Sequence, residues 1–495
     1  MRYLHRILAA SILALLAPPA RSFSQTSAEL MVRATAAVQA ATARAQADPA
    51  HPAFHITAPA QWINDPNGPL YHNGYYHLFY QLHPFSDASG PKYWGHVRSR
   101  DLVKWEHLPI ALCPSPELGE AEVWSGCCTV NGRGQPMIFY TSIAHDTSAS
   151  THAEQWAATS DDAMLIWHKL PSNPVLSESL HGEKKIYDWR DPFIFRASGK
   201  TFLVTGGNLN QARGGQAIVN IYQAQNDDLT QWTYRGVLFQ HPDADARTVE
   251  CPNFFRLGSQ WVLLLSPYGR VQYFIGDFDP AACRFHPHHR GLVDYGPNFY
   301  APNTMQLASG RRLVWGWVNG FPEGHGWNGC LSLPRQLSLS PDGQLQQEPA
   351  PELRKLRGAP RAWRRIPLSR QQQTLSLPDT DALEIQVALD LQNASSLLLK
   401  LQGEGQDTPG LTLQCSRSEL VFQDTKVPLE LANSELRLHI FLDRSVFEVF
   451  ANKAACVTKT IRPLTGHLIL TASAENGAGR LERAEAWPVN SIWLR

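Results

Sequence analysis

Residues 62–68 read Trp-Ile-Asn-Asp-Pro-Asn-Gly, and two shorter segments later in the chain share their character. These are Trp-Arg-Asp-Pro at 189–192 and Val-Glu-Cys-Pro at 249–252. Each places a carboxylate beside a proline, or one position further away, after an aromatic or apolar residue. Because proline fixes the local backbone, such a carboxylate would be held rigidly. Each segment alone also fits an ordinary turn, since Asp-Pro and Asn-Gly are common turn formers.

The spacing of these segments predicts a repeat of about 60 residues. The steps are 60 positions from Asp65 to Ser125, 66 to Asp191, 59 to Glu250 and 67 to Trp317. A step of that length fits four short strands. In a β-propeller the blades are arranged radially, so equivalent residues of successive blades converge on the central axis. The spacing therefore predicts five blades with the three carboxylates in one pocket, although no clean sequence repeat supports the period.

Short apolar runs between residues 54 and 346 support an all-β domain. They are bounded by Gly, Pro, Asn or Asp, as expected of short strands joined by tight turns. The runs lie at 75–80, 201–205, 217–222, 261–265, 271–275 and 313–318. The sequence thus predicts a propeller domain over 54–346.

The C-terminal part of the chain shows a different β pattern. Residues 347–364 begin Pro-rich and charged, which is typical of a linker. Leu383, Ile385, Val387 and Leu389 then alternate with mainly polar residues. Strict alternation indicates strands buried on one face, so a β-sandwich is predicted over 365–495.

The N-terminus resembles a secretory signal. Arg2 and Arg6 flank an apolar stretch at 7–17, which is too short to span a bilayer and is followed by Pro and small residues. We expect cleavage of residues 1–24 and export of the mature chain; a buried core helix is the alternative. Residues 25–53 are predicted to form a helix and a lead-in, since Thr26 and Glu29 are spaced as a capping box.

Composition narrows the possible partners. The 495 residues carry 44 Lys and Arg against 44 Asp and Glu, so no basic footprint points to nucleic acid or an anionic membrane. The length suggests two or three domains.

The cysteines and histidines do not form a metal-binding pattern. The eight cysteines include no Cys-x-x-Cys pair. Pro287 interrupts the histidines at 286, 288 and 289 near Cys283, so we expect a solvated loop there. No metal or cofactor is expected, and the chain is expected to be a monomer or weak oligomer.

A pocket with three carboxylates and aromatic walls suits a sugar. Glycosidic cleavage needs one acid to protonate the leaving oxygen and one carboxylate to attack or to activate water. Burial and like charges separate the pKa values of neighbouring carboxyl groups, so one can stay protonated while another is ionised.

The three segments, in this order, resemble the signature of glycoside hydrolase family 32, the β-fructosidases (invertases, inulinases, levanases and related fructosyltransferases). The similarity covers roughly residues 54–495. Further segments that resemble the family lie at 80–81, 94–96, 99–105, 124–126, 294–296, 299–301, 316–317, 326–329, 331–335, 443–446 and 448–450. The resemblance implies a five-bladed propeller followed by a β-sandwich.

The resemblance also implies a retaining mechanism with three catalytic carboxylates. Asp65 would be the nucleophile and Glu250 the general acid/base. Asp191 would grip fructose hydroxyls and stabilise the transition state. The family's substrate-binding positions correspond here to Asn64, Gln81, Trp94, Trp124, Ser125, Arg190 and Trp317.

Several of these assignments have alternatives. Arg190 could instead form a structural ion pair, and Trp94 and Trp124 could be blade-core residues. Cys251 is expected to affect the environment of Glu250. Asp443, Arg444 and Glu448 are interpreted as a domain-packing or strand-edge set.

Three departures from the family pattern leave the preferred substrate open. Phe193 stands where many members have Lys, Leu82-His83-Pro84 where Tyr-Asn-Pro is usual, and Cys127 where Ser is frequent. None removes a catalytic group.

The function predicted from the sequence is a secreted exo-acting β-fructosidase that releases fructose from sucrose or from the end of a fructan such as inulin or levan. One alternative is a fructosyltransferase, although Asn64 before Asp65 favours hydrolysis. Others are a propeller glycosidase acting on arabinan or xylan, and a fructan-binding module without catalysis.

Overall fold

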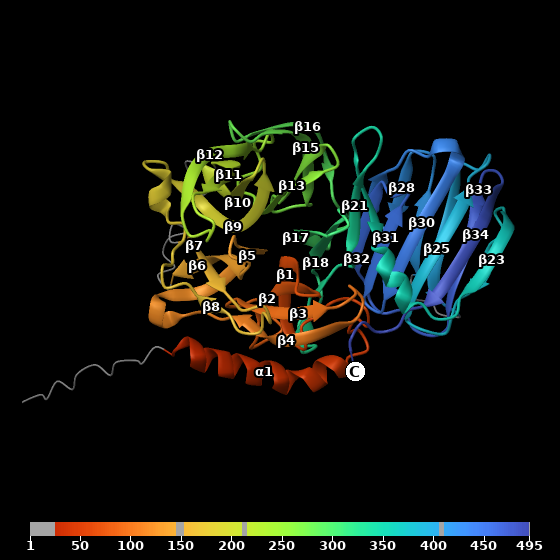
Figure 1. The fold of residues 1–495 in the computed structure, drawn as a ribbon. Helices are drawn as coiled ribbons and strands as arrows, with labels where there is room; N and C mark the ends of the chain where they lie inside the picture. Colours follow the sequence, from red (N-terminus) through yellow and green to blue (C-terminus); the bar gives the residue numbers. More distant parts are fainter. Residues whose placement is uncertain (1–24, 145–152, 210–214, 405–409, 495) are drawn as a thin grey trace, which may run out of the picture.

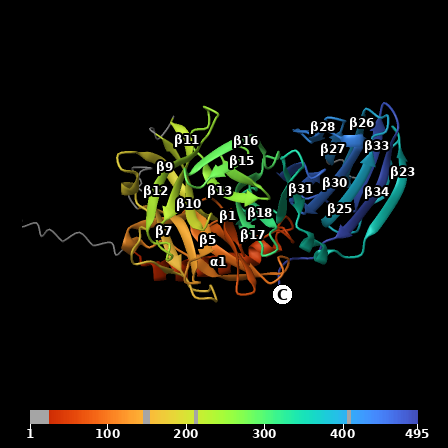
Figure 2. The same ribbon diagram turned by 45° about the horizontal axis from the view of Figure 1, so that its top comes forward.

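The computed structural model describes residues 25–144, 153–209, 215–404 and 410–494, so the predicted signal at 1–24 lies outside the described residues. The described chain forms two β domains side by side (Figure 1), and a second view shows the same arrangement (Figure 2). The first is a five-bladed β-propeller and the second a β-sandwich. The predicted fold class is confirmed.

Each blade is an antiparallel sheet whose first strand lies innermost. The first strands β1, β5, β9, β13 and β17 contact one another around the ring, including β1 with β17. The strands of blades one to three are β1 (Gln61–His72), β2 (Tyr75–His83), β3 (Tyr93–Ser99), β4 (Trp105–Leu112), β5 (Glu120–Val130), β6 (Pro136–Ala144), β7 (Ala153–Thr159), β8 (His168–Lys169), β9 (Ile186–Ala197), β10 (Lys200–Leu209), β11 (Gln216–Ala224) and β12 (Trp232–Gln240). Those of blades four and five are β13 (Glu250–Leu257), β14 (Gln260–Ser266), β15 (Gln272–Asp279), β16 (Arg284–Leu292), β17 (Phe299–Gln306), β18 (Arg312–Val318), β20 (Cys330–Leu331), β21 (Arg335–Leu339) and β22 (Leu345–Pro349).

The ring closes through a short parallel pair. Strand β19 (Trp327–Asn328) follows β18 in the chain but pairs with β1 of the first blade. Helix α1 (Ser27–Ala47), drawn in red along the first blade in Figure 1, ends beside this pair. Arg44 donates to the Gly324 carbonyl, and the Trp327 indole donates to Asp48 over 3.0 Å. The N-terminal helix therefore holds the segment that closes the ring.

The predicted helix start is confirmed. Thr26 is the N-cap of α1, its side chain accepts from the Glu29 amide, and the Glu29 side chain accepts from the Thr26 amide. These reciprocal bonds satisfy two backbone donors that have no partner inside the helix. Ala34, Val38 and Ala45 are buried, so small side chains let the helix lie close to the propeller.

Every innermost strand is interrupted at the same place by a β-bulge. The register shifts around Pro66, Gly126, Pro192, Pro252 and Pro302. Proline cannot donate to a strand ladder, and a bulge sets two residues against one and turns the side chains. The residue before proline has a positive φ at Asp191 (61°), Cys251 (47°) and Ala301 (46°).

These bulges explain how neighbouring residues of one strand can both face the axis, whereas regular strand residues alternate between faces. We count back from the residue named above for each bulge, which is Pro or, in the second blade, Gly126. The residues two positions before it form the upper tier, and the residues immediately before it form the lower tier. The upper tier is Asn64, Trp124, Arg190, Glu250 and Tyr300. The lower tier is Asp65, Ser125, Asp191, Cys251 and Ala301.

The sandwich packs two six-stranded sheets over one apolar core. Leu383, Ile385, Val387 and Leu389 point into it, as the alternation predicts. One sheet contains β23 (Arg361–Leu368), β34 (Gly479–Pro488), β25 (Ala382–Asp390), β30 (Glu435–Asp443), β31 (Val446–Ala451) and β32 (Ala455–Thr460). The other contains β24 (Gln373–Ser376), β33 (Leu468–Glu475), β26 (Ser396–Gly403), β27 (Leu411–Cys415), β28 (Glu419–Phe422) and β29 (Thr425–Pro428).

Two local predictions need correction. The linker predicted over 347–364 is shorter, because β22 continues to Pro349 and β23 begins at Arg361. The histidines at 286, 288 and 289 lie in the outer strand β16 rather than in a loop, because β15 pairs with this segment across a register shift next to Pro287. The short 3₁₀ helices are η1 (Pro116–Leu118), η2 (Glu178–His181), η3 (Pro351–Leu356) and η4 (Ala432–Ser434).

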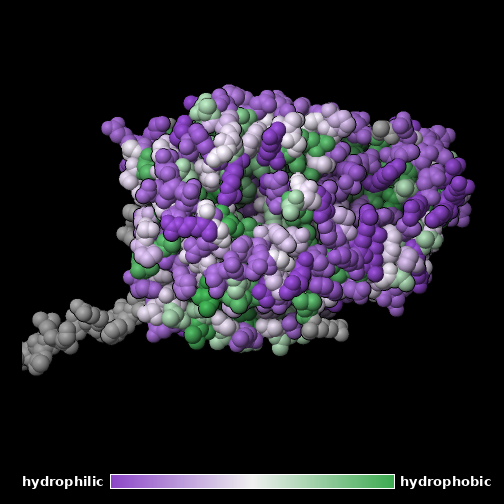
Figure 3. Space-filling model, viewed as in Figure 1, coloured by the Kyte–Doolittle hydropathy of each residue, from purple (hydrophilic) through white to green (hydrophobic). Residues whose placement is uncertain are grey.

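The surface, the cysteines and the helices each bear on what the composition suggests. Hydrophilic residues cover most of the face seen in Figure 3. All eight cysteines lie within the described residues and are free thiols. Across the described part of the chain, no helix is long and apolar enough to cross a membrane.

A buried ionic network joins the two domains. Arg335, with 0% exposure, binds Asp294 of the propeller and Glu448 of the sandwich, each over 2.8 Å. His55 contacts Asp443 through Nδ1 (2.8 Å) and Glu448 through Nε2 (3.0 Å). Asp443 also accepts three backbone amides of the lead-in, at residues 53–55. The interpretation of Asp443 and Glu448 as domain-packing residues is confirmed.

This network predicts a loss of stability in mild alkali. Burial alone would lower the pKa of His55, but its bonds to Asp443 and Glu448 raise it to about 9. The stabilisation is complete below the unfolded value of about 6.5 and is lost as pH rises through about 9. We expect the unfolding free energy to fall by up to about 3 kcal/mol across that range. Urea unfolding at several pH values measures it.

The variant His55→Gln is the matched control, because it cannot gain or lose this proton. It should be less stable at pH 6, and its difference from the wild type should shrink towards pH 9.5. A constant difference would show that His55 does not titrate in this range.

Candidate active site

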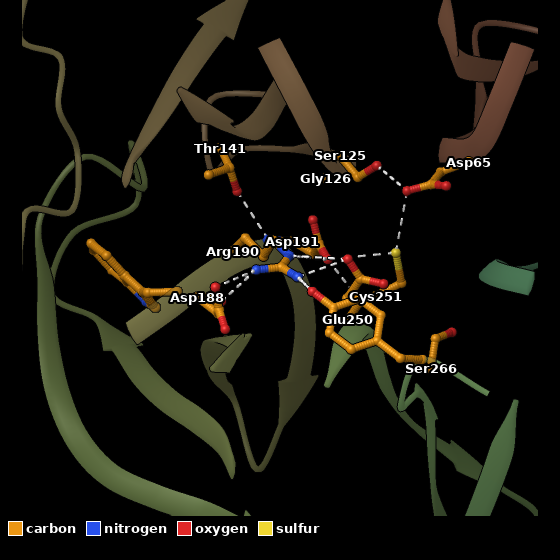
Figure 4. Close-up of polar contacts among 12 residues, drawn as sticks. Asp65, Ser125, Gly126, Thr141, Asp188, Arg190, Asp191, Glu250, Cys251 and Ser266 are labelled. Atoms are coloured by element: carbon orange, nitrogen blue, oxygen red, sulfur yellow. Dashed lines mark hydrogen bonds and ion pairs between the residues drawn. The ribbon is translucent and has the colours of Figure 1, made fainter. Parts of the chain in front are cut away.

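The lower tier holds two of the three predicted catalytic carboxylates close together. Asp65 Oδ2 accepts from the Ser125 hydroxyl over 2.6 Å, and the Cys251 thiol lies 3.6 Å from Asp65 and 3.6 Å from Asp191. Asp191 Oδ2 also accepts from the Cys251 amide over 2.9 Å. Figure 4 shows these side chains converging from separate strands. Residues 126 positions apart therefore share one site.

The upper tier positions the third carboxylate. Arg190 donates to Glu250 Oε1 from both Nε (3.2 Å) and Nη2 (2.8 Å), and the Tyr300 hydroxyl lies 2.6 Å from Glu250 Oε2. Each oxygen of Glu250 thus has its own partner. Asp191 is 3.9 Å from Arg190 Nε, and its amide donates to Thr141. Arg190 therefore contacts both carboxylates, which agrees with the ion-pair alternative given for it from the sequence.

Burial governs the electrostatics of the pocket. It raises the pKa of Asp65, and the charge of Glu250 adds to the rise, while bonds from Ser125 and Asn64 oppose it. Burial also raises the pKa of Asp191; Arg190 opposes this, and Glu250 and Asp65 add to it. The mutual effects on pKa indicate that the three acids lie within electrostatic reach of one another.

The other predicted binding residues surround these acids with one exception. Asn64 donates to Asp65 over 3.1 Å and contacts Gln81, and Trp317 packs against Trp62 with ring centroids 5.6 Å apart. The Trp124 ring lies 5.7 Å from the Arg190 guanidinium and is only partly buried.

Trp94 is the exception, because it lies in the blade core, which is the alternative given for it from the sequence. It has 0% exposure, packs in an apolar cluster between the first two blades, and donates its indole N–H to the Trp124 carbonyl over 3.0 Å. No sugar can touch it in this structure. Its role is to support the strand that carries Trp124 and Ser125.

The structure adds Tyr300 and Tyr268, which are not among the site residues predicted from the sequence. Tyr300 is the upper-tier residue of the fifth blade and is therefore the residue equivalent to Glu250. Trp317, which the spacing identifies instead, lies opposite Tyr300 on the neighbouring strand β18. Tyr268 contacts Arg190 through its hydroxyl and donates its amide to Tyr300 over 3.1 Å. The signal that could have found Tyr300 is Tyr-Ala-Pro at 300–302, which repeats the spacing of Glu-Cys-Pro.

The Cys251 prediction is also corrected. Its thiol lies between Asp65 and Asp191 rather than against Glu250. The reason is the bulge, which places Cys251 in the lower tier and Glu250 in the upper one.

The space beneath the lower tier is small. It is a cavity of about 10 Å³, lined by Asn67, Phe193, Asn253 and Asn303 among others, which is enough for about one water molecule. This cavity is too small for a sugar ring. Within the described residues, no group of three or more His, Cys, Asp or Glu is arranged to hold a metal ion.

Ser125 provides a specific test of this electrostatic description. Its hydroxyl lowers the pKa of Asp65 by stabilising the carboxylate. In Ser125→Ala the pKa of Asp65 should rise further, so the acidic limb of the kcat/KM profile should move to higher pH. We expect kcat/KM to fall by about 10- to 100-fold, the usual worth of a hydrogen bond to a charged group. A pH–rate profile measures both.

Ser99→Ala is the matched control, since Ser99 is a buried serine bonded to a carboxylate, Asp101, outside the site. Its pH profile should be unchanged. An unmoved acidic limb in Ser125→Ala would contradict the role assigned to this bond.

A propeller that brings three carboxylates and one buried arginine together at its axis has the groups that a glycosidase needs. One acid can protonate a leaving oxygen while a second attacks the sugar carbon. The chain belongs to glycoside hydrolase family 32: the family's N-terminal domain matches residues 55–349 and its C-terminal domain matches residues 352–488.

Relatives and solved structures agree with this membership. The chain is 30% identical to a sucrose-6-phosphate hydrolase of Zymomonas mobilis over 81% of this chain and 83% of that protein. It is 31% identical to a levanase of Bacillus subtilis, over 89% of this chain and 71% of that protein. The structure resembles a β-fructofuranosidase from Bombyx mori, with TM-score 0.79 and 27% identity, over 94% and 99% of the two chains.

Proposed function

We propose that this protein is a retaining β-fructosidase that releases fructose from sucrose or from the end of a fructan. The observation that carries the proposal is the placement of Asp65, which receives bonds from Ser125 and Asn64, within electrostatic reach of Glu250, which is held by Arg190 and Tyr300. Relatives named for sucrose 6-phosphate, levan and raffinose support a fructosyl substrate rather than arabinan or xylan.

In the proposed reaction Asp65 attacks the anomeric C2 of the fructosyl unit. The bond to the leaving oxygen breaks, and that oxygen takes the proton of Glu250. A water molecule then gives a proton to the Glu250 carboxylate and attacks C2, which releases fructose and frees Asp65. Two displacements at C2 retain its configuration. Asp191 and its neighbour Arg190 supply charge and hydrogen bonds for the fructose hydroxyls and the developing oxocarbenium ion.

The Tyr300 hydroxyl can change its hydrogen-bond acceptor when Glu250 gains or loses its proton. Its hydroxyl has one proton, and it lies 2.6 Å from Glu250 and 3.3 Å from the Ser266 carbonyl. When Glu250 is ionised, Tyr300 donates to it; when Glu250 carries the proton on that oxygen, Tyr300 can turn its donor to Ser266. Both states of the acid/base therefore keep a partner.

Export is part of the same proposal. It rests on the apolar stretch at 7–17 between basic and small residues. N-terminal sequencing of the protein recovered from outside the producing cells tests it; a chain that keeps residues 1–24 and stays in the cytoplasm would contradict it.

Product analysis tests the substrate class. We expect free fructose as the main product from at least one of sucrose, inulin, levan and sucrose 6-phosphate, each separated by chromatography. Longer oligosaccharides with little free fructose at high sucrose concentration would favour the fructosyltransferase alternative. Release of arabinose or xylose instead of fructose would overturn the proposal.

A further inference from the structure

The propeller axis has a second cavity at the end opposite the catalytic carboxylates. It has a volume of about 520 Å³ and is lined by all five innermost strands at positions after their bulges. The tier of Asn67, Asn253 and Asn303 separates it from the catalytic tiers. It is therefore a neighbouring cavity, which shares Phe193 and Asn303 with the small cavity beneath the catalytic carboxylates, and the proposed mechanism does not use it.

The charge of this axial cavity has one sign. Its lining includes three arginines, Arg196, Arg256 and Arg312, and no Asp or Glu. Arg196 and Arg256 are exposed at the surface. Within the described part of the chain, none of the three forms an ion pair with a carboxylate. Tyr71, Phe255 and Trp261 add aromatic surface.

Arg312 is the decisive residue because it is 92% buried without a counter-ion. Nη1 donates to Thr304 (3.0 Å), Nη2 donates weakly to Gln306 (3.4 Å), and Nε is buried with no partner. A guanidinium has five N–H donors, so most of its capacity is unused. One face packs on the Phe255 ring at 4.2 Å.

Leaving a charge buried and unpaired is costly, and proteins pair such charges or bring them a ligand. Burial lowers the pKa of Arg312 to about 9, which still leaves the group charged at neutral pH. The arginine fork fits the oxygens of a phosphoryl group in two-point fashion. The cavity thus has a charged base, two charged side chains at its exposed part, and aromatic surface beside them.

We propose that this axial cavity binds a phosphoryl anion, held by Arg312 at its base and by Arg196 and Arg256 near its opening. The volume accepts a phosphate that carries a small organic group, and the aromatic residues provide surface for that group. Free phosphate and a hexose phosphate present the same oxygens, so both are tested.

The test is isothermal titration of the whole protein with inorganic phosphate and, separately, with glucose 6-phosphate, at constant ionic strength adjusted with chloride. We expect saturable binding of one anion per chain and a rise in the thermal midpoint of about 2–5 °C at saturation. Tighter binding of the hexose phosphate would assign the aromatic surface to its sugar ring; equal binding would assign the site to the phosphoryl group alone.

Variants locate the anion. Arg312→Gln should abolish binding, and Arg312→Lys should weaken it by about 10-fold or more, because a lysine keeps the charge but loses the fork. Arg311→Gln is the control, since the neighbouring Arg311 pairs with Glu352 instead. If Arg312→Gln does not fold, the double variant Arg196→Gln/Arg256→Gln should still weaken binding several-fold.

A phosphate bound at the catalytic site must be distinguished from one bound here. In the inactive variant Asp65→Asn, saturating fructose should not displace the anion from the axial cavity. Absence of binding at about 10 mM phosphate, a concentration that would detect even a ligand with a millimolar Kd, would overturn the proposal. Binding that survives Arg312→Gln or is displaced by fructose would overturn it too. None of these results depends on which fructoside the enzyme cleaves.

Discussion

Replacing Asp65 by asparagine is expected to lower kcat/KM for fructosyl substrates by at least about 10⁴-fold, since the nucleophile is lost while its shape is kept. Replacing Glu250 by glutamine should cost about 10²- to 10⁴-fold, the usual contribution of a general acid/base. Steady-state kinetics with sucrose measures both losses. Near-normal activity in either variant would remove the mechanism proposed here.

The same substitution at Asp65 should not harm the fold. Because burial raises the pKa of Asp65, its ionised form destabilises the folded state at neutral pH. Asparagine removes that charge, so the thermal midpoint of Asp65→Asn at pH 7 should equal or exceed that of the wild type. A lower midpoint would mean that the activity loss includes a folding defect.

Azide distinguishes the nucleophile role of Asp65 from the general acid/base role of Glu250. With a fructosyl donor that has a good leaving group, Glu250→Ala still forms the fructosyl-enzyme, so azide should restore turnover and give β-fructosyl azide. Asp65→Gly has no nucleophile, so azide should attack C2 directly and give the α-anomer. The same anomer from both variants would contradict a covalent intermediate on Asp65.

Arg335→Met is expected to have the largest effect on stability. It leaves Asp294 and Glu448 buried without the cation that joins them. Removing one partner of a buried ionic network typically costs about 3–5 kcal/mol. Because the two acids belong to different domains, we also expect the propeller and the sandwich to unfold in separate steps. Calorimetry measures the midpoint and the number of transitions.

Arg364→Met is the matched control, since Arg364 is an exposed arginine on β23 of the sandwich. Its effect should stay within about 0.5 kcal/mol, as for most surface substitutions. A single transition with an unchanged midpoint in Arg335→Met would show that apolar packing alone holds the domains together.

The sequence predicted the blades and the three acids because both depend on a local pattern. An acid one or two positions before a proline, at a step of about 60 residues or twice that, marks the bulge in three of the five innermost strands. The spacing identifies Trp317 as the landmark of the fifth blade, because Tyr300 is not an acid and gives no chemical signal. A proline two positions later is the feature that Tyr300 shares with Glu250.

Side-chain direction was harder to predict. A strict period of two would place Glu250 and Cys251 on opposite faces, and the register shift and the positive φ of Cys251 (47°) reveal the bulge that changes this. The sequence cannot decide whether Trp94 binds the sugar or packs in a blade, because an aromatic residue gives the same signal in both places. The partners of Asp443 and Glu448 were invisible, since His55 is 388 residues from Asp443.

The pairing of β19 with β1 has a consequence for biosynthesis. Gln61 leaves the ribosome 266 positions before its partner Trp327. Until then the nascent first blade has a vacant inner edge, which could recruit a foreign strand.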